Sequence, residues 1–194
     1  AEGVLANQFI GYDVEDFDTQ DLLSVCSLGE GYDFDFSVYD NPDSFSFEIP
    51  LAGGAKIIRT FTFYPDSFHF DLSQELINFD QVNAGRYFAT SWSGGVAPTE
   101  KNRKDDLYYS EMYALLGDDS SPSDYSADED RESEVQTALT TWVGTRSKYF
   151  TAILIPERSV SEFKMVRYQT AGGDDNSEKI FDFDVRDAFD RRSA

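Results

Sequence analysis

Cysteine and histidine are almost absent from this chain of 194 residues, which has one of each. A lone Cys26 rules out a disulfide within the chain, so the disulfide framework typical of small secreted domains is excluded. A zinc shell built from several cysteine and histidine ligands is excluded for the same reason. We expect Cys26 to be a small buried hydrophobe.

Long apolar runs are also missing. The longest one near the middle of the chain extends from Tyr149 to Pro156 and is interrupted by Thr151. A membrane-spanning helix needs about 20 apolar residues, and a signal peptide needs a basic segment followed by an apolar run, which the start of the chain lacks. We therefore expect the chain as it stands to be soluble, with any membrane anchors of the protein lying outside it.

Basic residues are scarce: 16 stand against 37 acidic ones, for a formal charge of -21. Such a charge repels the phosphates of nucleic acids and the anionic face of a bilayer, so neither is an expected partner. Asp outnumbers Glu by 24 to 13 and Arg outnumbers Lys by 10 to 6. This bias resembles proteins adapted to high salt, where screening weakens surface self-repulsion; an acidic surface that only confers solubility is the alternative.

Aromatic residues are abundant, with 17 Phe and 11 Tyr, and many of them alternate with polar residues. The segment 32–38 places Tyr32, Phe34 and Phe36 on one face of a strand and Asp33 and Asp35 on the other. Turn residues rich in Gly and Pro separate such runs, which predicts antiparallel strands. The chain is therefore predicted to be all-β, a large sandwich with minor helical segments. The other predicted strands are 45–51, 57–63, 68–72, 84–92, 135–145, 149–155, 161–168 and 179–185.

Two polar segments interrupt this pattern. Residues 117–134 contain hardly an apolar side chain and are predicted to form a long solvated loop, and residues 172–177 have the same character. We find no internal repeat and no domain boundary. The prediction is a single domain over residues 1–194.

The residues suited to catalysis or metal binding form no specific pattern. His69 has no partner motif, so we expect a surface or inter-sheet histidine and not a catalytic one, and no G-x-S-x-G element is present. The acidic residues lack the spacing of a helix-loop-helix calcium site, and Asp182 and Asp184 are predicted to lie on the solvated face of a strand. We therefore predict no catalytic residue, no metal ligand and no cofactor.

The stretch 142–156, WVGTRSKYFTAILIP, resembles a signature of the periplasmic domain of the YidC family of membrane protein insertases, in which Trp-x-Gly or Trp-x-Ala precedes a Tyr-Phe strand ending in Ile-Pro. The stretches 57–78, IIRTFTFYPDSFHFDLSQELIN, and 92–102 are also similar to that family. The similarity covers about Ile57 to Pro156.

The resemblance implies a twisted antiparallel β-supersandwich similar to galactose mutarotase-like proteins. It also implies a noncatalytic domain on the periplasmic side of the bacterial inner membrane that aids the insertion and folding of membrane proteins. The implied partners are nascent membrane proteins and the Sec translocon components SecYEG and SecDF. The family's domain begins with further strands, and its C-terminal linker helix is only partial in 187–194, so we expect a fragment that lacks the transmembrane insertase core.

Several aromatic residues are candidates for contact with a partner. Trp142, Tyr149 and Phe150 are the most family-like positions, and we expect them to be core residues, since large aromatics in strands are more often buried. The residues Tyr108, Tyr109 and Tyr113 either line a peptide-binding cleft or belong to an amphipathic helical turn packed on the sandwich.

Two other functions stay open beside the insertase domain, which would act through a sheet edge or a cleft. A carbohydrate-binding or carbohydrate-active β-sandwich would need a pocket with converging carboxylates. A calcium-stabilised adhesion module would lose thermal stability on chelation.

Overall fold

Alternating polar and apolar residues form antiparallel strands through most of the described part of the chain. The computed structural model describes residues 4–10, 16–18, 25–26, 43–99, 101–171 and 177–188. Within these residues the protein is mostly β, with one short α-helix and two 3₁₀ turns, Ala52–Gly54 and Phe79–Gln81. None of the described helices is long and apolar enough to span a bilayer. The chain divides into two compact units, residues 1–9 with 86–189 and residues 10–85 with 190–194.

The larger sheet of the first unit contains strands from distant parts of the sequence. Within this unit the strands of the sheet follow the order β10-β13-β14-β7-β1, and every neighbouring pair among them is antiparallel. The hairpin β13–β14 lies in the middle, and β14 pairs with β7, where Phe183 lies opposite Trp92. The bounds are β1 Val4–Ile10, β7 Tyr87–Ser93, β10 Glu132–Gln136, β13 Glu162–Gln169 and β14 Lys179–Ala188.

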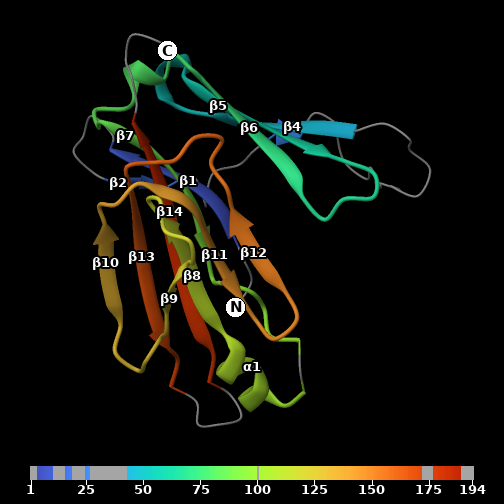
Figure 1. The fold of residues 1–194 in the computed structure, drawn as a ribbon. Coiled ribbons are helices and arrows are strands. Elements are labelled where there is room, and N and C mark those ends of the chain that lie inside the picture. The colour runs from blue at the N-terminus through green and yellow to red at the C-terminus, as the bar shows by residue number, and fades with distance from the viewer. Residues whose placement is uncertain are drawn as a thin grey trace. The chain divides into compact units, whose positions relative to one another are not determined.

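A four-stranded antiparallel sheet of order β12-β11-β8-β9 lies in front of the larger sheet in Figure 1. The helix α1 directly precedes β8, and the hairpin β11–β12 forms one side of the sheet. The register of β11 against β8 shifts between Thr140 and Trp142, which marks a β-bulge. The bounds are α1 Arg103–Tyr109, β8 Glu111–Leu116, β9 Ser123–Tyr125, β11 Thr140–Arg146 and β12 Thr151–Leu154.

The core of the first unit lies between these two sheets. Met112 and Val143 of the four-stranded sheet are fully buried and belong to one cluster with Phe163, Phe181 and Phe183 of the larger sheet. In β8 the buried positions alternate with half-buried ones, as expected for a strand with one face in a core. The other face of the four-stranded sheet is therefore directed away from the core.

The second unit contains a separate antiparallel sheet of order β3-β4-β5-β6. One face carries Phe45, Phe47 and Phe61, whose rings are 5.3 to 5.8 Å apart, whereas the opposite face carries the ion pair of Lys56 with Glu48 at 2.8 Å. The alternation of the sequence thus produces an amphipathic sheet. The strands of this unit are β2 Asp16–Asp18, β3 Val25–Cys26, β4 Asp43–Pro50, β5 Lys56–Phe63 and β6 Phe70–Ile77.

Most of the strands predicted from alternation are confirmed, although their ends move by a few residues. The predicted strand 135–145 is wrong, because residues 137–139 separate β10 from β11, which belong to different sheets. The predicted loop 117–134 contains β9, and Ala127 within it is buried. The predicted strand 32–38, residues 172–176 of the second polar segment and the Cys26 side chain lie outside the described residues.

One acidic side chain departs from the expected solvated face. Asp184 is buried, and its carboxylate accepts a hydrogen bond from Nε of Arg186 at 2.7 Å. Burial raises the pKa of Asp184 above its usual value, and the hydrogen bond from the Arg186 guanidinium offsets only part of this rise. The prediction that Asp184 faces water is therefore wrong; Asp182 is half-buried, and its Oδ1 accepts a hydrogen bond from the backbone N–H of Gly94 at 2.7 Å.

Candidate functional site

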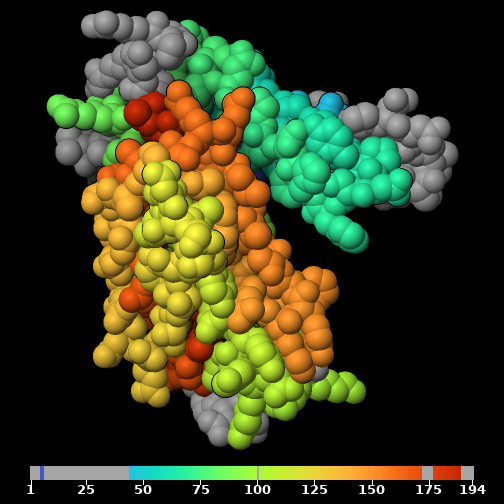
Figure 2. Space-filling model, viewed as in Figure 1, coloured from blue at the N-terminus to red at the C-terminus, as the bar shows by residue number. Residues whose placement is uncertain are grey.

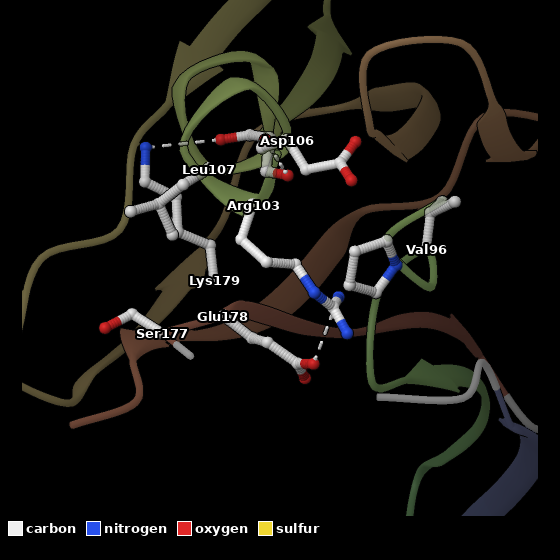
Figure 3. Close-up of a pocket in the computed structure, with 9 residues that line it drawn as sticks. Val96, Arg103, Asp106, Leu107, Ser177, Glu178 and Lys179 are labelled. Atoms are coloured by element: carbon white, nitrogen blue, oxygen red, sulfur yellow. Dashed lines mark hydrogen bonds and ion pairs between the residues drawn. The ribbon is translucent and has the colours of Figure 1, made fainter. Parts of the chain in front are cut away.

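The pocket beside α1 is too small for an organic ligand. Its space is about 10 Å³, room for roughly one water molecule, whereas ligand pockets usually have several hundred Å³. Figure 3 shows Arg103 reaching toward Glu178, and the ion pair between Nη1 and Oε1 is 3.6 Å long. The pocket is lined by Val96, Pro98, Arg103, Asp106, Leu107, Ser110, Ser177, Glu178 and Lys179.

The described residues also hold no cluster that suits a metal ion. No group of three or more His, Cys, Asp or Glu side chains converges within the described ranges. The sole histidine, His69, is exposed just before β6, where its Nδ1 is hydrogen-bonded to Ser67 Oγ, as expected for a surface histidine. The surface features of the first unit are therefore the stronger candidates for function.

The strand β12 forms an edge of the four-stranded sheet. It pairs with β11 on one side, and no described strand pairs with its other side. Side chains on the strand and next to it are apolar and exposed: Ile153 by 50%, Ile155 by 68%, Tyr149 by 64% and Phe150 by 56%. We call these four residues the apolar edge. The hairpin that carries them, orange in Figure 2, lies on the visible face of the molecule.

The turn that leads into β12 is held by its own backbone and by α1. The N–H of Ser147 donates to the carbonyl of Phe150 at 2.8 Å, and Nζ of Lys148 donates to Oδ2 of Asp105 in α1 at 3.0 Å. The hydrogen bond to Asp105 is the main reason that the pKa of Lys148 is raised. Nζ of Lys148 also lies 5.1 Å from the ring centroid of Tyr149. These contacts position the exposed aromatic side chains.

The face of the sheet beside the apolar edge depends on a glycine. Gly144 of β11 lies opposite Ile153 of β12 and opposite Tyr113 of β8. A Cβ at position 144 would come within 2.8 Å of the carbonyl oxygen of Ala152 and 2.9 Å of Cγ1 of Ile153. Because real Cβ atoms essentially never approach that closely, the packing of β12 on β11 requires glycine here. In this chain the close approach of the two strands accounts for glycine, and not alanine, at the third position of the element.

At the end of the four-stranded sheet next to α1, polar side chains of β8 and β11 form a hydrogen-bonded group. Glu111 of β8 accepts hydrogen bonds from the hydroxyl of Tyr113 and from Nη2 of Arg146, the latter at 2.8 Å. The hydrogen bond from Tyr113, followed by the one from Arg146, holds the pKa of Glu111 below its usual range. The Arg146 guanidinium also lies 5.2 Å from the Tyr113 ring centroid. Arg146 is thus held both by the carboxylate of Glu111 and by the ring of Tyr113.

The aromatic residues singled out in the sequence have different environments. Trp142 is half-buried on β11, whereas Tyr149 and Phe150 are exposed, so the expectation that these two are core residues is wrong. Tyr108 and Tyr109 are exposed at the end of α1, with ring centroids 5.0 Å apart, and Tyr113 is half-buried on β8 outside the helix.

The sequence does not predict that Ile153 and Ile155 are exposed. Apolar residues fill both faces of the segment 149–155, so the alternation gives no sign of which face is exposed. The Ile-Pro ending of the family signature was the only signal at these positions.

A model of the YidC periplasmic domain matches residues 36–185. The chain is 29% identical over 176 residues to a protein of Chlorobium phaeovibrioides named membrane protein insertase YidC, which covers 90% of this chain and 30% of that protein. Proteins of the same name from Chlorobium limicola and Chlorobaculum parvum are 35% identical over 96 residues and 31% identical over 115 residues. These two cover 50% and 59% of the chain and 16% and 20% of their own lengths. The chain therefore spans at most about a third of the curated relatives it matches.

Proposed function

The chain belongs to the YidC periplasmic domain family, and on that premise we propose that it serves an insertase that aids the insertion and folding of inner-membrane proteins. The family is not enzymatic, and its place is the periplasmic side of the inner membrane. The proposed role is contact with nascent membrane proteins or with Sec translocon components such as SecYEG and SecDF. The insertion step is assigned to the rest of the longer protein.

The observation that carries this proposal is the apolar edge. Soluble antiparallel sheets normally present polar side chains on a face that meets water, and natural sheets protect their edges with charge or proline. Here Tyr149, Phe150, Ile153 and Ile155 are all about half exposed or more, and β12 has no charged residue. Exposed apolar side chains along an open sheet edge are typical of surfaces that bind other polypeptides.

Photo-crosslinking in the full-length insertase tests this role. A photoreactive amino acid placed at Tyr149 is expected to crosslink to nascent membrane proteins or to translocon subunits during insertion. The matched control is Val135, which is also exposed and apolar but lies on β10, the edge of the other sheet. Equal crosslinking from the two positions, or none from Tyr149, would contradict a specific role for the apolar edge.

We also propose the finer architecture that the family implies, a galactose mutarotase-like β-supersandwich formed as one domain over residues 1–194. The antiparallel sheets that enclose a common core in the first unit support it. A single cooperative thermal transition, with equal calorimetric and van't Hoff enthalpies, is expected for one domain. Two separate transitions would show that the units fold independently.

A second candidate function has one observation in its favour. At the turn between β5 and β6, Phe63, Tyr64, Asp66, Ser67 and Phe68 line an open hollow of about 400 Å³. Aromatic faces beside a carboxylate and a hydroxyl are suited to a sugar ring. Calorimetric titration with mono- and disaccharides, compared with a Phe68→Ala variant, tests it. Heat of binding that is lost in the variant would support carbohydrate binding, and no heat would exclude it for the sugars used.

A further inference from the structure

The backbone of β12 offers hydrogen-bonding groups toward its open side. Ser147 and Phe150 form a hydrogen-bonded pair at the start of the hairpin, and such pairs alternate along an antiparallel ladder. In the register of this hairpin, Ala152 and Leu154 therefore bond to β11. The N–H and C=O groups of Thr151 and Ile153 point the other way, where no described strand lies. An arriving strand would find these groups ready to pair.

We propose that β12 binds an extended polypeptide segment as an added strand, with apolar residues of that segment packing against Ile153 and Ile155. The proposal rests on the contact role above and specifies how that contact is made. The backbone ladder would give affinity without much sequence preference, and the apolar edge would select segments with an apolar residue at every second position. Such a surface suits many different client segments.

Charge identifies the kind of segment that fits best. The chain carries a formal charge of -21, so a second copy would bring the same charge and be repelled. A segment with basic residues beside its apolar stretch is attracted instead, and its association is faster at low ionic strength. We therefore assign the open side of β12 to an extended apolar segment flanked by Lys or Arg, and not to self-association.

Two substitutions of Ile153 distinguish the contribution of backbone pairing from that of side-chain contact. Proline is tolerated in an edge strand where its missing N–H faces solvent, so Ile153→Pro removes the outward donor and leaves the bonds to β11 in place. Ile153→Ala removes most of the same side chain but keeps the donor. If a strand adds to β12, Ile153→Pro weakens binding by about fivefold to tenfold more than Ile153→Ala, the effect of one lost hydrogen bond. Thr151→Pro provides a second outward position if Ile153→Pro does not fold.

The test uses the 194-residue chain and a short synthetic peptide that alternates valine and threonine between pairs of lysines. Hydrogen exchange of the wild-type chain is followed by NMR with and without peptide. The expected result is new protection of the Thr151 and Ile153 amides, which face outward, whereas Ala152 and Leu154 are protected already. A control peptide with glutamates in place of the lysines is expected to bind more weakly at low salt, and this difference should shrink as salt is added.

Two outcomes would overturn strand addition. One is peptide binding without protection of Thr151 and Ile153, and the other is a rise in molecular mass that shows dimers of the chain itself. Failure of the wider contact role is distinguishable from both, because it appears as absence of crosslinks from Tyr149 in the full-length insertase. Crosslinks that persist while the outward amides stay unprotected would leave the contact role intact and eliminate only the added strand.

Discussion

The edge strands β10 and β12 end the two sheets of the same unit, and they are protected very differently. Glu132 and Glu134 of β10 both pair with Arg167 of the neighbouring strand β13, the second at 3.5 Å. The guanidinium of Arg167 also lies 5.6 Å from the Tyr125 ring centroid. In β12 every residue is uncharged, and Ile153 is half exposed. Both strands are short, so chemistry and not length distinguishes them.

The difference between β10 and β12 bears on which of the two edges can pair with another strand. Charged side chains on an edge strand block pairing with another chain, because an incoming strand would have to desolvate them. The chain has this protection on β10, although its overall charge of -21 already opposes association. The lack of the same protection on β12 is the contrast on which the proposed strand addition rests.

The largest effect on stability is expected from Gly144→Ala, which acts where β12 is attached. The new Cβ would meet the Ala152 carbonyl at 2.8 Å and Cγ1 of Ile153 at 2.9 Å, so the two strands must move apart. We expect a loss of about 2 kcal/mol in the free energy of unfolding, typical of overpacking. Urea denaturation followed by circular dichroism measures it.

The double variant Gly144→Ala/Ile153→Ala serves as the control for this contact. Removing Cγ1 of Ile153 relieves one of the two clashes and leaves the one with the backbone oxygen. The double variant should therefore be more stable than the sum of the single changes predicts, by about 0.5 to 1 kcal/mol. Strict additivity would mean that the strands do not approach as closely as the structure has them.

The next largest effect is expected when β10 loses its protection. Glu132→Val combined with Glu134→Val removes both carboxylates from Arg167, whose side chain is only 17% exposed. Because both glutamates are about half exposed, we expect a loss of about 1 kcal/mol and no more. The same change creates an open apolar edge but leaves a formal charge of -19, two fewer than the -21 of the wild type, so association in sedimentation velocity is expected at high salt, where the repulsion is screened, and not at low salt. Ser133→Val, which adds an apolar residue but keeps the charges, is expected to stay monomeric.

The sequence predicted the strands better than it predicted their surroundings. Local alternation is sufficient for β14, because Phe181, Phe183 and Val185 form an apolar face in the core of the first unit. The break between β10 and β11 was missed since residues 137–139 contain neither Gly nor Pro. The strand β8 was missed because Tyr113 and Leu115 interrupt its alternation.

No local sequence pattern explains why Tyr149 and Phe150 are exposed. Aromatic residues in a strand-like segment are usually buried, and the sequence gives no sign that β12 is the last strand of its sheet. That position follows from long-range pairing, in which β11 lies between β8 and β12. The candidate site is thus a property of the topology, although the motif that contains it was visible.

A smaller and pH-dependent effect is expected for Glu111→Gln at the polar end of the β12 sheet. The hydrogen bonds from Tyr113 and Arg146 lower the pKa of Glu111 in the folded state, so the ionised form favours folding. This contribution is complete above the unfolded pKa of about 4.3 and is lost as the pH falls through the lower folded pKa. Arg146 is 42% exposed, and screening limits the effect to about 0.5 kcal/mol.

Stability curves at pH 7 and at pH 3 measure this difference. The wild-type chain should exceed Glu111→Gln in stability at pH 7, and the two should converge in acid. A gap that is the same at both pH values would show that the carboxylate charge is not what stabilises this end of the sheet.

The smallest effect on stability is expected from Ile153→Lys, which gives β12 the kind of protection that β10 already has. The side chain is half exposed and the ladder with β11 is unchanged, so the free energy of unfolding should stay within about 0.5 kcal/mol of the wild-type value. Binding of the lysine-flanked peptide and crosslinking from Tyr149 should nevertheless both fall, because the new charge must be desolvated when a strand adds. Ile153→Val keeps the edge apolar and should bind as the wild type does. If Ile153→Lys folds normally and crosslinks as strongly as Ile153→Val, the contrast between the two edges has no role in partner binding.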